Sequence, residues 1–343
     1  MLEDKIMTYC IDLEPLPLIT LGIPVKNRAW CIDKVLKAIE GLDYPKNKIK
    51  IIFVDDYSKD GTYEAIISWT QKNKNKFHGI RVIRERSNIP KARNLCIKHM
   101  EGKYILFWDS DVIPPESLLK KMIEIMEKQD DIGIIGADYF YNSYSKEASN
   151  KTNVNIETHA IYMGFTLIKR KILDLIGGFN ENLTVGEDTD FCIRVKENTK
   201  FKILWSPDPV LHLKREEDLR KGVTGLLKWL KFNFYTRGED YAITFKNLPR
   251  LLKIRIIYYL LLPQIFIVTP IMVYQLTFTP TISSLLVLIT YLTYLAPGMY
   301  LEVKGSTLKR GLVRFFRFNM PTGIALSYGI IFHLMKSIFR KGG

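Results

Sequence analysis

The sequence has few cysteines, and their spacing forms no recognisable pair. The four stand alone with no C-x-x-C spacing that would bind zinc, so we interpret them as reduced and mostly buried: Cys10, Cys31, Cys96 and Cys192. With 21 glycines and 15 prolines in 343 residues, the chain has too little of either for a fibrous protein. Residues 1–14 lack the basic start and the apolar stretch of a signal peptide, which predicts that the bulk of the chain stays in the cytoplasm.

The charge is distributed unevenly along the chain. Fifty Lys and Arg residues against 36 Asp and Glu give a formal charge of +14, and a hydrophobic content of 47% excludes intrinsic disorder. After residue 217 there are 17 basic residues against four acidic ones, so that part of the chain carries nearly the whole excess. A basic excess is typical of proteins that bind nucleic acid or anionic lipid. The first 217 residues are almost neutral, which disfavours a nucleic-acid-binding domain there.

Short β-branched runs alternate with amphipathic stretches of helical length up to about residue 213. The expected strands are Leu18–Pro24, Ile49–Val54, Ile80–Ile83, Tyr104–Trp108, Ile132–Ala137 and Leu204–Leu213. The expected helices are Ile32–Glu40, Thr62–Lys72, Ile89–His99 and Pro115–Glu127. This alternation predicts an α/β fold with a mostly parallel sheet and helices on both faces. Ligands of such sheets bind beyond the carboxyl ends of the strands, so the residues that close the strands are the first candidates for a site.

Long apolar runs follow this region. Residues 256–276 and 281–301 contain no charged residue, and each run is long enough to cross a bilayer. A third run, 318–338, has two basic or titratable side chains near its end, where a long side chain reaches the interface. Buried core helices are the alternative, but they are usually only about ten to fourteen residues long. The sequence therefore predicts a helical transmembrane domain.

Two stretches beside these runs mix basic with aromatic residues, namely 218–237 and 308–318. They are typical of helices that lie in the headgroup plane, with an ordinary surface helix as the alternative.

The resulting domain boundaries are 1–217 for the α/β domain, 218–250 for an amphipathic interface segment and 251–343 for the transmembrane domain. The Lys/Arg-rich connection 304–317 is expected on the cytoplasmic side. We therefore expect a multi-pass protein of the cell membrane whose first domain faces the cytoplasm.

Four polar clusters lie where the predicted sheet would bind a ligand. The first is G-I-P-V-K-N-R at 22–28, and the second is V-D-D-Y-S-K-D-G-T at 54–62, where two carboxylates close an apolar strand. The third is D-S-D at 109–111, whose acids would repel each other if left unpaired, and a hard divalent cation is the usual remedy. The fourth is G-E-D-T-D-F-C-I-R at 186–194. Helix capping is a structural alternative for part of the second cluster and for the fourth.

In chain order these clusters resemble those of a known enzyme family. The series V-D-D-x-S-x-D-G-T, A-R-N at 92–94, D-S-D, G-G-F-N-E-N-L at 177–183 and G-E-D-x-D-F-x-x-R is similar to that of the family 2 glycosyltransferases, inverting enzymes of the Rossmann-like GT-A fold. The resemblance covers roughly residues 18–213. The apolar tail is similar to that of integral-membrane members that glycosylate polyprenyl carriers, such as the dolichyl-phosphate mannosyltransferases. The Q-x-x-R-W signature of processive synthases is absent after Asp190, which implies transfer of a single sugar.

The resemblance implies a role for each matching residue. Those at the nucleotide-sugar would be Pro24, Val25, Asn27, Arg28, Asp55, Asp56, Arg93, Asp109 and Ser110. Asp109 and Asp111 would form the D-x-D motif, with Asp111 binding Mn²⁺ or Mg²⁺ and His212 completing the metal shell. An imidazole ligand favours Mn²⁺, and a purely structural His212 is the alternative. Asp188 matches the catalytic base and Glu187 the residue that supports it.

The nature of the acceptor decides what the base does. An acceptor hydroxyl must lose its proton, which a carboxylate within about 3 Å accepts. A lipid phosphate instead arrives mostly ionised, so Asp188 would orient it and cations would matter more. The cations expected to hold such a phosphate are Lys214, Arg215, Arg220 and Lys221, with a solvated junction as the alternative.

The resemblance thus implies a metal-dependent inverting transfer, with GDP-mannose as donor and a dolichyl or polyprenyl phosphate as acceptor, in glycan biosynthesis. The alternative is a UDP-sugar enzyme, using UDP-glucose or UDP-N-acetylglucosamine, that extends a lipid-linked glycan. A nucleic-acid-binding protein is disfavoured because the domain with the ligand crevice is neutral. A catalytically inactive membrane scaffold is disfavoured because the acids of all the clusters are present.

Overall fold

The computed structural model describes residues 16–141, 156–158, 161–183 and 186–214, with three isolated positions beyond them. Apart from two of these isolated positions, Tyr274 and Tyr328, the described residues do not include the predicted interface segment 218–250, the spans 256–276, 281–301 and 318–338, or the stretch 308–318. Within the described part of the chain, no helix is long and apolar enough to cross a membrane. The chain divides into two compact units: residues 1–87, 92–178 and 200–213 form the first, and residues 88–91, 179–199 and 214–343 form the second.

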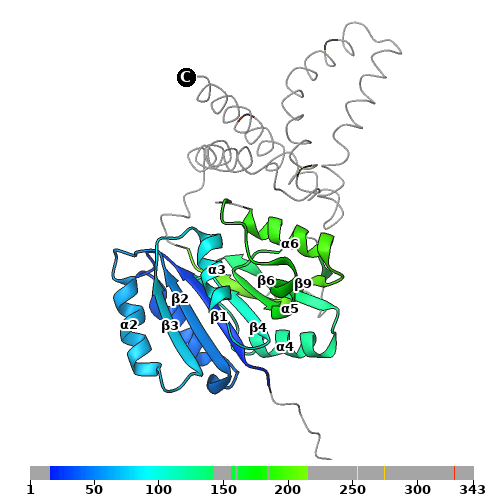
Figure 1. Ribbon diagram of the computed structural model, residues 1–343. Coiled ribbons are helices and arrows are strands. Elements are labelled where there is room, and N and C mark those ends of the chain that lie inside the picture. The colour runs from blue at the N-terminus through cyan, green and yellow to red at the C-terminus, as the bar shows by residue number, and fades with distance from the viewer. Residues whose placement is uncertain are drawn as a thin grey trace, which may run out of the picture. The chain divides into compact units, whose positions relative to one another are not determined.

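The first unit is built on one mixed β-sheet (Figure 1), which has nine strands within the described residues. Along the chain they are β1 (Ile19–Val25), β2 (Ile49–Asp55), β3 (Gly79–Arg84), β4 (Tyr104–Trp108), β5 (Val112–Ile113), β6 (Ile132–Tyr141), β7 (Ile156–Glu157), β8 (Phe165–Lys169) and β9 (Lys202–His212). Their spatial order is β3-β2-β1-β4-β8-β6-β9-β5, with β7 paired to β9.

The described helices are α1 (Ile32–Gly41), α2 (Thr62–Asn73), α3 (Ile89–Lys98), α4 (Leu118–Lys128), α5 (Arg170–Ile176) and α6 (Glu187–Asn198), with a short 3₁₀ helix at Lys46–Lys48. Successive side chains of a strand point to opposite faces of the sheet. Leu21, Phe53 and Leu106 join one cluster with the buried sides of α1, α2 and α4. On the other face, Gly22 lies against Cys96 of α3 and Phe107, so close that an added Cβ would stand 2.9 Å from the Cys96 Cβ. Helices therefore cover both faces, as predicted.

The predicted elements are confirmed, with shifts of a few residues at their ends. The prediction of a mostly parallel sheet was wrong for one half of it. The pairs β1–β2, β1–β4, β2–β3 and β6–β9 are parallel, whereas β4–β8, β6–β8, β5–β9 and β7–β9 are antiparallel. The missed strands explain the error. Strands β5 and β7 have two residues each, too few for a periodic signal, and β8 runs into α5 without an intervening turn residue.

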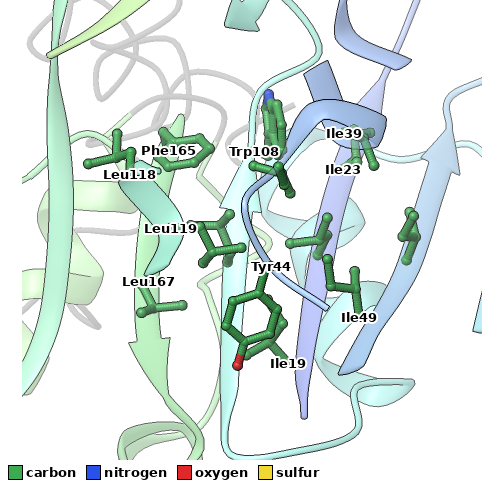
Figure 2. Packing of buried hydrophobic residues seen from close by; sticks show 14 of the residues in the cluster. Ile19, Ile23, Ile39, Tyr44, Ile49, Trp108, Leu118, Leu119, Phe165 and Leu167 are labelled. Atoms are coloured by element: carbon green, nitrogen blue, oxygen red, sulfur yellow. The ribbon is translucent and has the colours of Figure 1, made fainter. Parts of the chain in front are cut away.

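The core fills the space between the sheet and the helices of one face (Figure 2). All five residues of β4 are buried, so its sequence shows no polar alternation, as expected of a strand covered on both faces. Trp108 at its end meets Phe165 of β8 edge to face, with ring centroids 5.1 Å apart. Burying each large apolar side chain stabilises the fold by about 1.5–3 kcal/mol. This rigid centre fixes where β4 ends.

The parallel half of the sheet brings three chain segments to the same edge. Val25 pairs with Asp55 across β1 and β2, and Gly22 pairs with Phe107 across β1 and β4. Because these strands run in one direction, the residues that follow them emerge together. The first three polar clusters of the sequence therefore lie along one edge of the sheet.

Candidate active site

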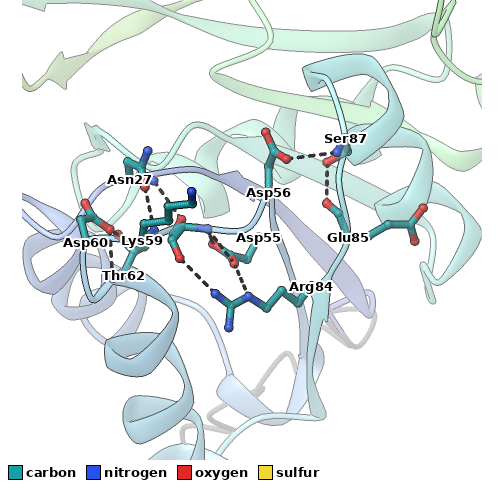
Figure 3. A network of polar contacts seen from close by, with 10 residues as sticks. Asn27, Asp55, Asp56, Lys59, Asp60, Thr62, Arg84, Glu85 and Ser87 are labelled. Carbon is teal, nitrogen blue, oxygen red and sulfur yellow. Dashed lines mark hydrogen bonds and ion pairs between the residues drawn. The ribbon is translucent and has the colours of Figure 1, made fainter.

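Asp55, the last residue of β2, is fully buried, and two donors hold its carboxylate (Figure 3). The backbone N–H of Ser58 donates to it at 3.2 Å, and Arg84 Nε lies 3.3 Å from its Oδ2. Arg84 also donates from Nη2 to the carbonyl oxygen of Ser58 at 3.0 Å. Removing one partner from such a buried pair leaves the other charge buried and unpaired. Asp55 thus shapes the turn after β2 and has little capacity left for a ligand.

The loops after β1 and β2 are tied together by polar contacts. The Asn27 backbone N–H donates to Ser58 Oγ at 2.9 Å, and the Lys59 N–H donates to Asn27 Oδ1 at 3.0 Å. Arg28 N–H donates to Thr62 Oγ1 at 2.7 Å. Asn27 and Tyr57 both adopt left-handed backbone conformations, with φ of 51° and 45°. Such non-glycine residues carry strain that the surrounding contacts must balance, which indicates a defined loop geometry.

Asp60 contributes to the same loop junction. Its carboxylate accepts hydrogen bonds from Thr62 Oγ1 at 2.5 Å, from Thr62 N–H at 3.2 Å and from Ala29 N–H at 3.0 Å. The helix-capping alternative is not confirmed for Asp60 and Thr62: α2 begins at Thr62 after Gly61, with no side-chain cap hydrogen bond, and Asp60 instead joins Thr62 to the first loop.

Asp56 differs from Asp55 because its carboxylate stands at the surface of the site. It pairs with Lys26 and accepts a hydrogen bond from the Ser87 backbone N–H at 3.3 Å. Beside it, the Arg84 guanidinium lies 5.4 Å from the ring centre of Tyr57, whose side chain is 46% exposed, and 4.2 Å from that of Tyr63. A half-buried acid next to an exposed aromatic ring is an arrangement that suits a planar polar ligand.

The D-x-D acids follow β4, and each faces an arginine. Asp109 Oδ1 lies 3.5 Å from Arg93 Nη2, and Asp111 Oδ2 lies 3.2 Å from Arg28 Nη2. Ser110 between them is buried, and its carbonyl oxygen lies 3.4 Å from the thiol of Cys31. The three-residue motif is thereby held by its backbone and points its two carboxylates at cations.

Burial raises the pKa of Asp109, the Arg93 guanidinium opposes this rise, and the like charge of Asp111 adds to it. The Asp109 side chain is still 36% exposed, so solvent moderates these effects. Its backbone N–H donates to the carbonyl oxygen of Gly164 at 2.7 Å, which links the motif to the segment before β8.

His212, at the end of β9, is brought to Asp111 by the short strand β5. Val112 pairs with His212, and the Leu213 N–H donates to the Asp111 carbonyl oxygen at 2.8 Å. The imidazole Nδ1 lies 3.0 Å from the Leu213 carbonyl oxygen, which only accepts hydrogen bonds, so Nδ1 carries the proton. The Nε2 atom of the ring faces Asp111 Oδ1, 3.8 Å away.

This geometry suits a shared cation. A histidine that donates from one ring nitrogen to a carbonyl and presents the other beside a carboxylate has the form of a metal ligand. Asp111 and His212 are therefore fit to hold a divalent ion together. The described residues contain no group of three or more His, Cys, Asp or Glu side chains gathered for a metal.

Glu187 and Asp188 begin α6 in the second unit. Gly186 before them has φ of 82°, a left-handed conformation that glycine adopts without strain. Glu187 is buried, while Asp188 is half-buried and accepts a hydrogen bond from the Thr189 N–H at 2.6 Å. Asp190 pairs with Arg194 one helical turn on, at 2.9 Å. Burial raises the pKa of Asp190, and Arg194 opposes the rise. Asp190, the last acid of the motif, is thus paired within α6.

The remaining predicted residues divide between the two units. Pro24 is half-buried and Val25 buried at the end of β1, and the Val25 carbonyl oxygen accepts from the Asp56 N–H at 3.0 Å. Lys214 is exposed and lies in the second unit. Three predicted phosphate ligands lie outside the described residues: Arg215, Arg220 and Lys221.

Sequence reasoning missed several residues of the first unit that lie in or against this site. Arg84 closes β3, so the same end-of-strand rule could have found it. The other missed residues lie in no sequence motif: they are Tyr139, Tyr162 and Gly164.

Residues 20–183 match the family described as Glycosyl transferase family 2. This part of the chain, just under half of it, is similar to the family 2 glycosyltransferases. Its sheet with helices on both faces is the GT-A-like fold that the motifs predicted. The match includes β1 to β8 and the first three polar clusters, and stops before Glu187 and Asp188.

Two curated proteins similar to this chain carry the name of glycosyltransferases. Glycosyltransferase AglE of Haloferax volcanii is 26% identical over 198 residues, which are 53% of this chain and 62% of the relative. The probable glycosyltransferase YdaM of Bacillus subtilis is 24% identical over 263 residues, which are 70% of this chain and 60% of the relative. The chain thus spans about three fifths of the length of these relatives.

A solved structure shares the fold. It is a mannosyltransferase from Pyrobaculum calidifontis in complex with GDP-Man and Mn²⁺, and it is 17% identical with a TM-score of 0.56. The match covers 94% of this chain and 88% of that one.

Proposed function

We propose that this chain is a metal-dependent inverting glycosyltransferase that moves one sugar from a nucleotide-sugar to a polyprenyl-linked acceptor. The observation that carries the proposal is a row of acids at one edge of the sheet, with a histidine beside them. Asp111 Oδ1 lies 3.8 Å from His212 Nε2. The donor tested first is GDP-mannose, which agrees with the GDP-Man bound in the mannosyltransferase that shares the fold.

The nucleotide would bind at the β1–β2 side of this edge. Asp56 offers a carboxylate to the polar edge of a base or to ribose hydroxyls, and Tyr57 offers an exposed ring beside it. The diphosphate would lie nearer the D-x-D motif, where Arg28 and Arg93 supply guanidinium groups. The Nε atom of Arg28 is buried and has no hydrogen-bond partner among the described residues. A buried donor of this kind suits a phosphate oxygen.

Asp111 and His212 would hold the metal, with Mn²⁺ favoured because one ligand is an imidazole nitrogen. When bound, a divalent ion supplies Lewis-acid neutralisation of the charge that develops on the leaving diphosphate. Asp109 would orient the D-x-D motif, because its N–H donates to the Gly164 carbonyl oxygen and its carboxylate pairs with Arg93.

Asp188 would act on the acceptor. It lies in the first turn of α6, a position that suits a negatively charged side chain, and it accepts the Thr189 N–H. An ionised carboxylate accepts the proton of an attacking hydroxyl, and attack opposite the leaving group inverts the anomeric carbon. The apolar runs after residue 255 would anchor the enzyme in the cell membrane with this domain in the cytoplasm, where nucleotide-sugars are available.

A thermal-shift panel on the full chain in detergent tests the proposal. GDP-mannose, UDP-glucose and UDP-N-acetylglucosamine are each added with Mn²⁺ or with EDTA. A ligand that binds only the native state raises stability by RT ln(1 + [L]/Kd), or about 2.7 kcal/mol at 100 times Kd. We expect one donor to stabilise the wild type in the presence of Mn²⁺, and EDTA to remove most of the effect.

Two variants make the test specific. Asp111→Asn should lose the Mn²⁺-dependent part of the shift, whereas Asp43→Asn, which changes an exposed surface aspartate, should retain it. A wild type that no nucleotide-sugar stabilises with either Mn²⁺ or Mg²⁺ would refute the proposal. The same holds if Asp111→Asn keeps a full Mn²⁺ response.

A further inference from the structure

An aromatic group stands beside the metal residues on the other side from Asp56. Tyr139 of β6 stacks on Tyr162, with ring centres 5.6 Å apart and planes at 24°. Tyr162 meets Trp205 of β9 at 5.7 Å and 60°, and Tyr139 meets His212 edge to face at 5.3 Å. We call Tyr139, Tyr162 and Trp205 the aromatic platform.

Tyr162 is the exposed member of this platform. Its side chain is 54% exposed, although two other rings fix its position. Its carbonyl oxygen accepts a hydrogen bond from Thr166 Oγ1 at 2.6 Å, which holds the backbone of the 161–164 segment. A large aromatic side chain that is both ordered and half open to solvent has little value for the core. It has the properties of a binding residue, because a rigid ring loses little entropy when a ligand covers it.

The platform is joined directly to the D-x-D motif. Gly164, two residues after Tyr162, accepts the Asp109 N–H at 2.7 Å, and His212 lies against Tyr139 on one side and Asp111 on the other. In the sheet, β2 with Asp55 lies on one side of β4, and β6 and β9 with the platform lie on the other side (Figure 1). A nucleotide-sugar that places its base near Asp56 and its diphosphate at the motif therefore points its sugar end toward the platform.

We propose that the aromatic platform binds a sugar ring of the acceptor, so that the acceptor already carries a sugar. This inference rests on the proposed function. One face of a pyranose presents C–H groups with weak positive character, which suit the negative face of an aromatic ring. An acceptor that ended in a bare lipid phosphate would leave such a ring uncovered. The attacking group is then a sugar hydroxyl, and its proton passes to a carboxylate as the new glycosidic bond forms and the nucleoside diphosphate departs.

The test measures sugar binding on the full chain in deuterated detergent with Mn²⁺ and GDP or UDP present. The probes are the methyl glycosides of mannose, glucose and N-acetylglucosamine, detected by saturation-transfer NMR and titrated for Kd. We expect at least one to bind the wild type, and Tyr162→Ala to weaken it about tenfold, as loss of an aromatic contact predicts. Tyr162→Phe should stay within about twofold, because it keeps the ring. Leu175→Ala, which removes an exposed apolar side chain of α5, is the matched control and should bind like the wild type.

Two further measurements separate this proposal from its alternatives. Donor binding, followed by the thermal shift described above, should be equal in Tyr162→Ala and the wild type. If Tyr162→Ala instead weakens donor binding, the platform holds the donor sugar and the proposal is wrong. It is also wrong if no methyl glycoside binds while farnesyl phosphate does, or if Tyr162→Ala binds glycosides normally. A wild type that binds glycosides through Tyr162 but responds to no nucleotide-sugar would support the platform and refute the proposed function.

Discussion

Gly164 is a position where an added methyl group tests the architecture of the site. A Cβ there would lie 1.8 Å from the Tyr139 hydroxyl oxygen and 2.7 Å from Asp109 Oδ2. Ordinary van der Waals contact begins near 3.4 Å, so the hydroxyl would have to retreat by about 1.6 Å. Tyr139 cannot turn aside freely because its ring is held between Tyr162 and His212.

Gly164→Ala should therefore reduce both stability and activity. Overpacking of this kind costs about 1–3 kcal/mol, which urea unfolding of the full chain measures. A displacement of about 1 Å near the reacting groups lowers the rate on the order of 10²-fold, so kcat/KM for sugar transfer should fall by that factor. The thermal shift that the donor causes with Mn²⁺ should weaken as well, because the added Cβ would also displace the Asp109 carboxylate.

Two matched variants separate the cause from a general effect of losing glycine. Gly79→Ala in β3 adds the same methyl group where nothing lies within 4 Å, and should change stability by less than about 0.5 kcal/mol. Tyr139→Phe removes the atom that Gly164→Ala strikes first, so the double variant should recover part of the loss through a coupling of about 1 kcal/mol. The reasoning fails if Gly164→Ala unfolds and turns over like Gly79→Ala, or if the two changes are additive.

Two further changes test the base and the loop junction. Asp188→Asn should lower turnover about 10²–10⁴-fold with a hydroxyl acceptor but leave substantial activity with farnesyl phosphate, and full activity with every acceptor would exclude the base role. Burial alone would raise the pKa of Asp60, but hydrogen bonds from Thr62 and Ala29 outweigh it and lower that pKa. Its carboxylate therefore stabilises the fold above about pH 4 and less below it. Asp60→Asn should lose at most about 1 kcal/mol at pH 7, since the group is exposed. Urea unfolding should show this difference shrink as the pH falls below 4, and a constant difference would contradict the assignment.

The parallel half of the fold could be predicted because its signals are local. Strands β1, β2 and β4 are short apolar runs that end in polar residues, and the rule that ligands bind at the carboxyl ends of strands then groups Asn27, Asp56 and Asp111. The fold confirms that grouping. Asp55 shows the limit of this rule. The sequence does not distinguish it from Asp56, although Asp55 is fully buried and only Asp56 reaches the surface of the site.

The antiparallel half could not be predicted because its signals depend on tertiary contacts. Gly164 meets Asp109 through a hydrogen bond between segments 55 positions apart, and no local pattern marks either end. Tyr139 and Tyr162 lie in no sequence motif, and only the structure shows that their rings stack and that the Tyr162 ring is exposed. The pairing of β5 with β9 depends on a strand of two residues, yet it brings His212 to Asp111.

The pairing of charges gives a physical reason for the proposed metal dependence that composition does not. Each acid of the site has a basic neighbour: Arg84 at Asp55, Lys26 at Asp56, Arg93 at Asp109 and Arg28 at Asp111. These four pairs balance one another in charge at the place where a strongly anionic ligand is proposed to bind. Because both arginines beside the D-x-D motif already neutralise a carboxylate, their donors can orient a diphosphate but their charge is largely spent. The remaining negative charge of the diphosphate favours a further cation, and Asp111 beside His212 Nε2 is the place where we propose that it binds.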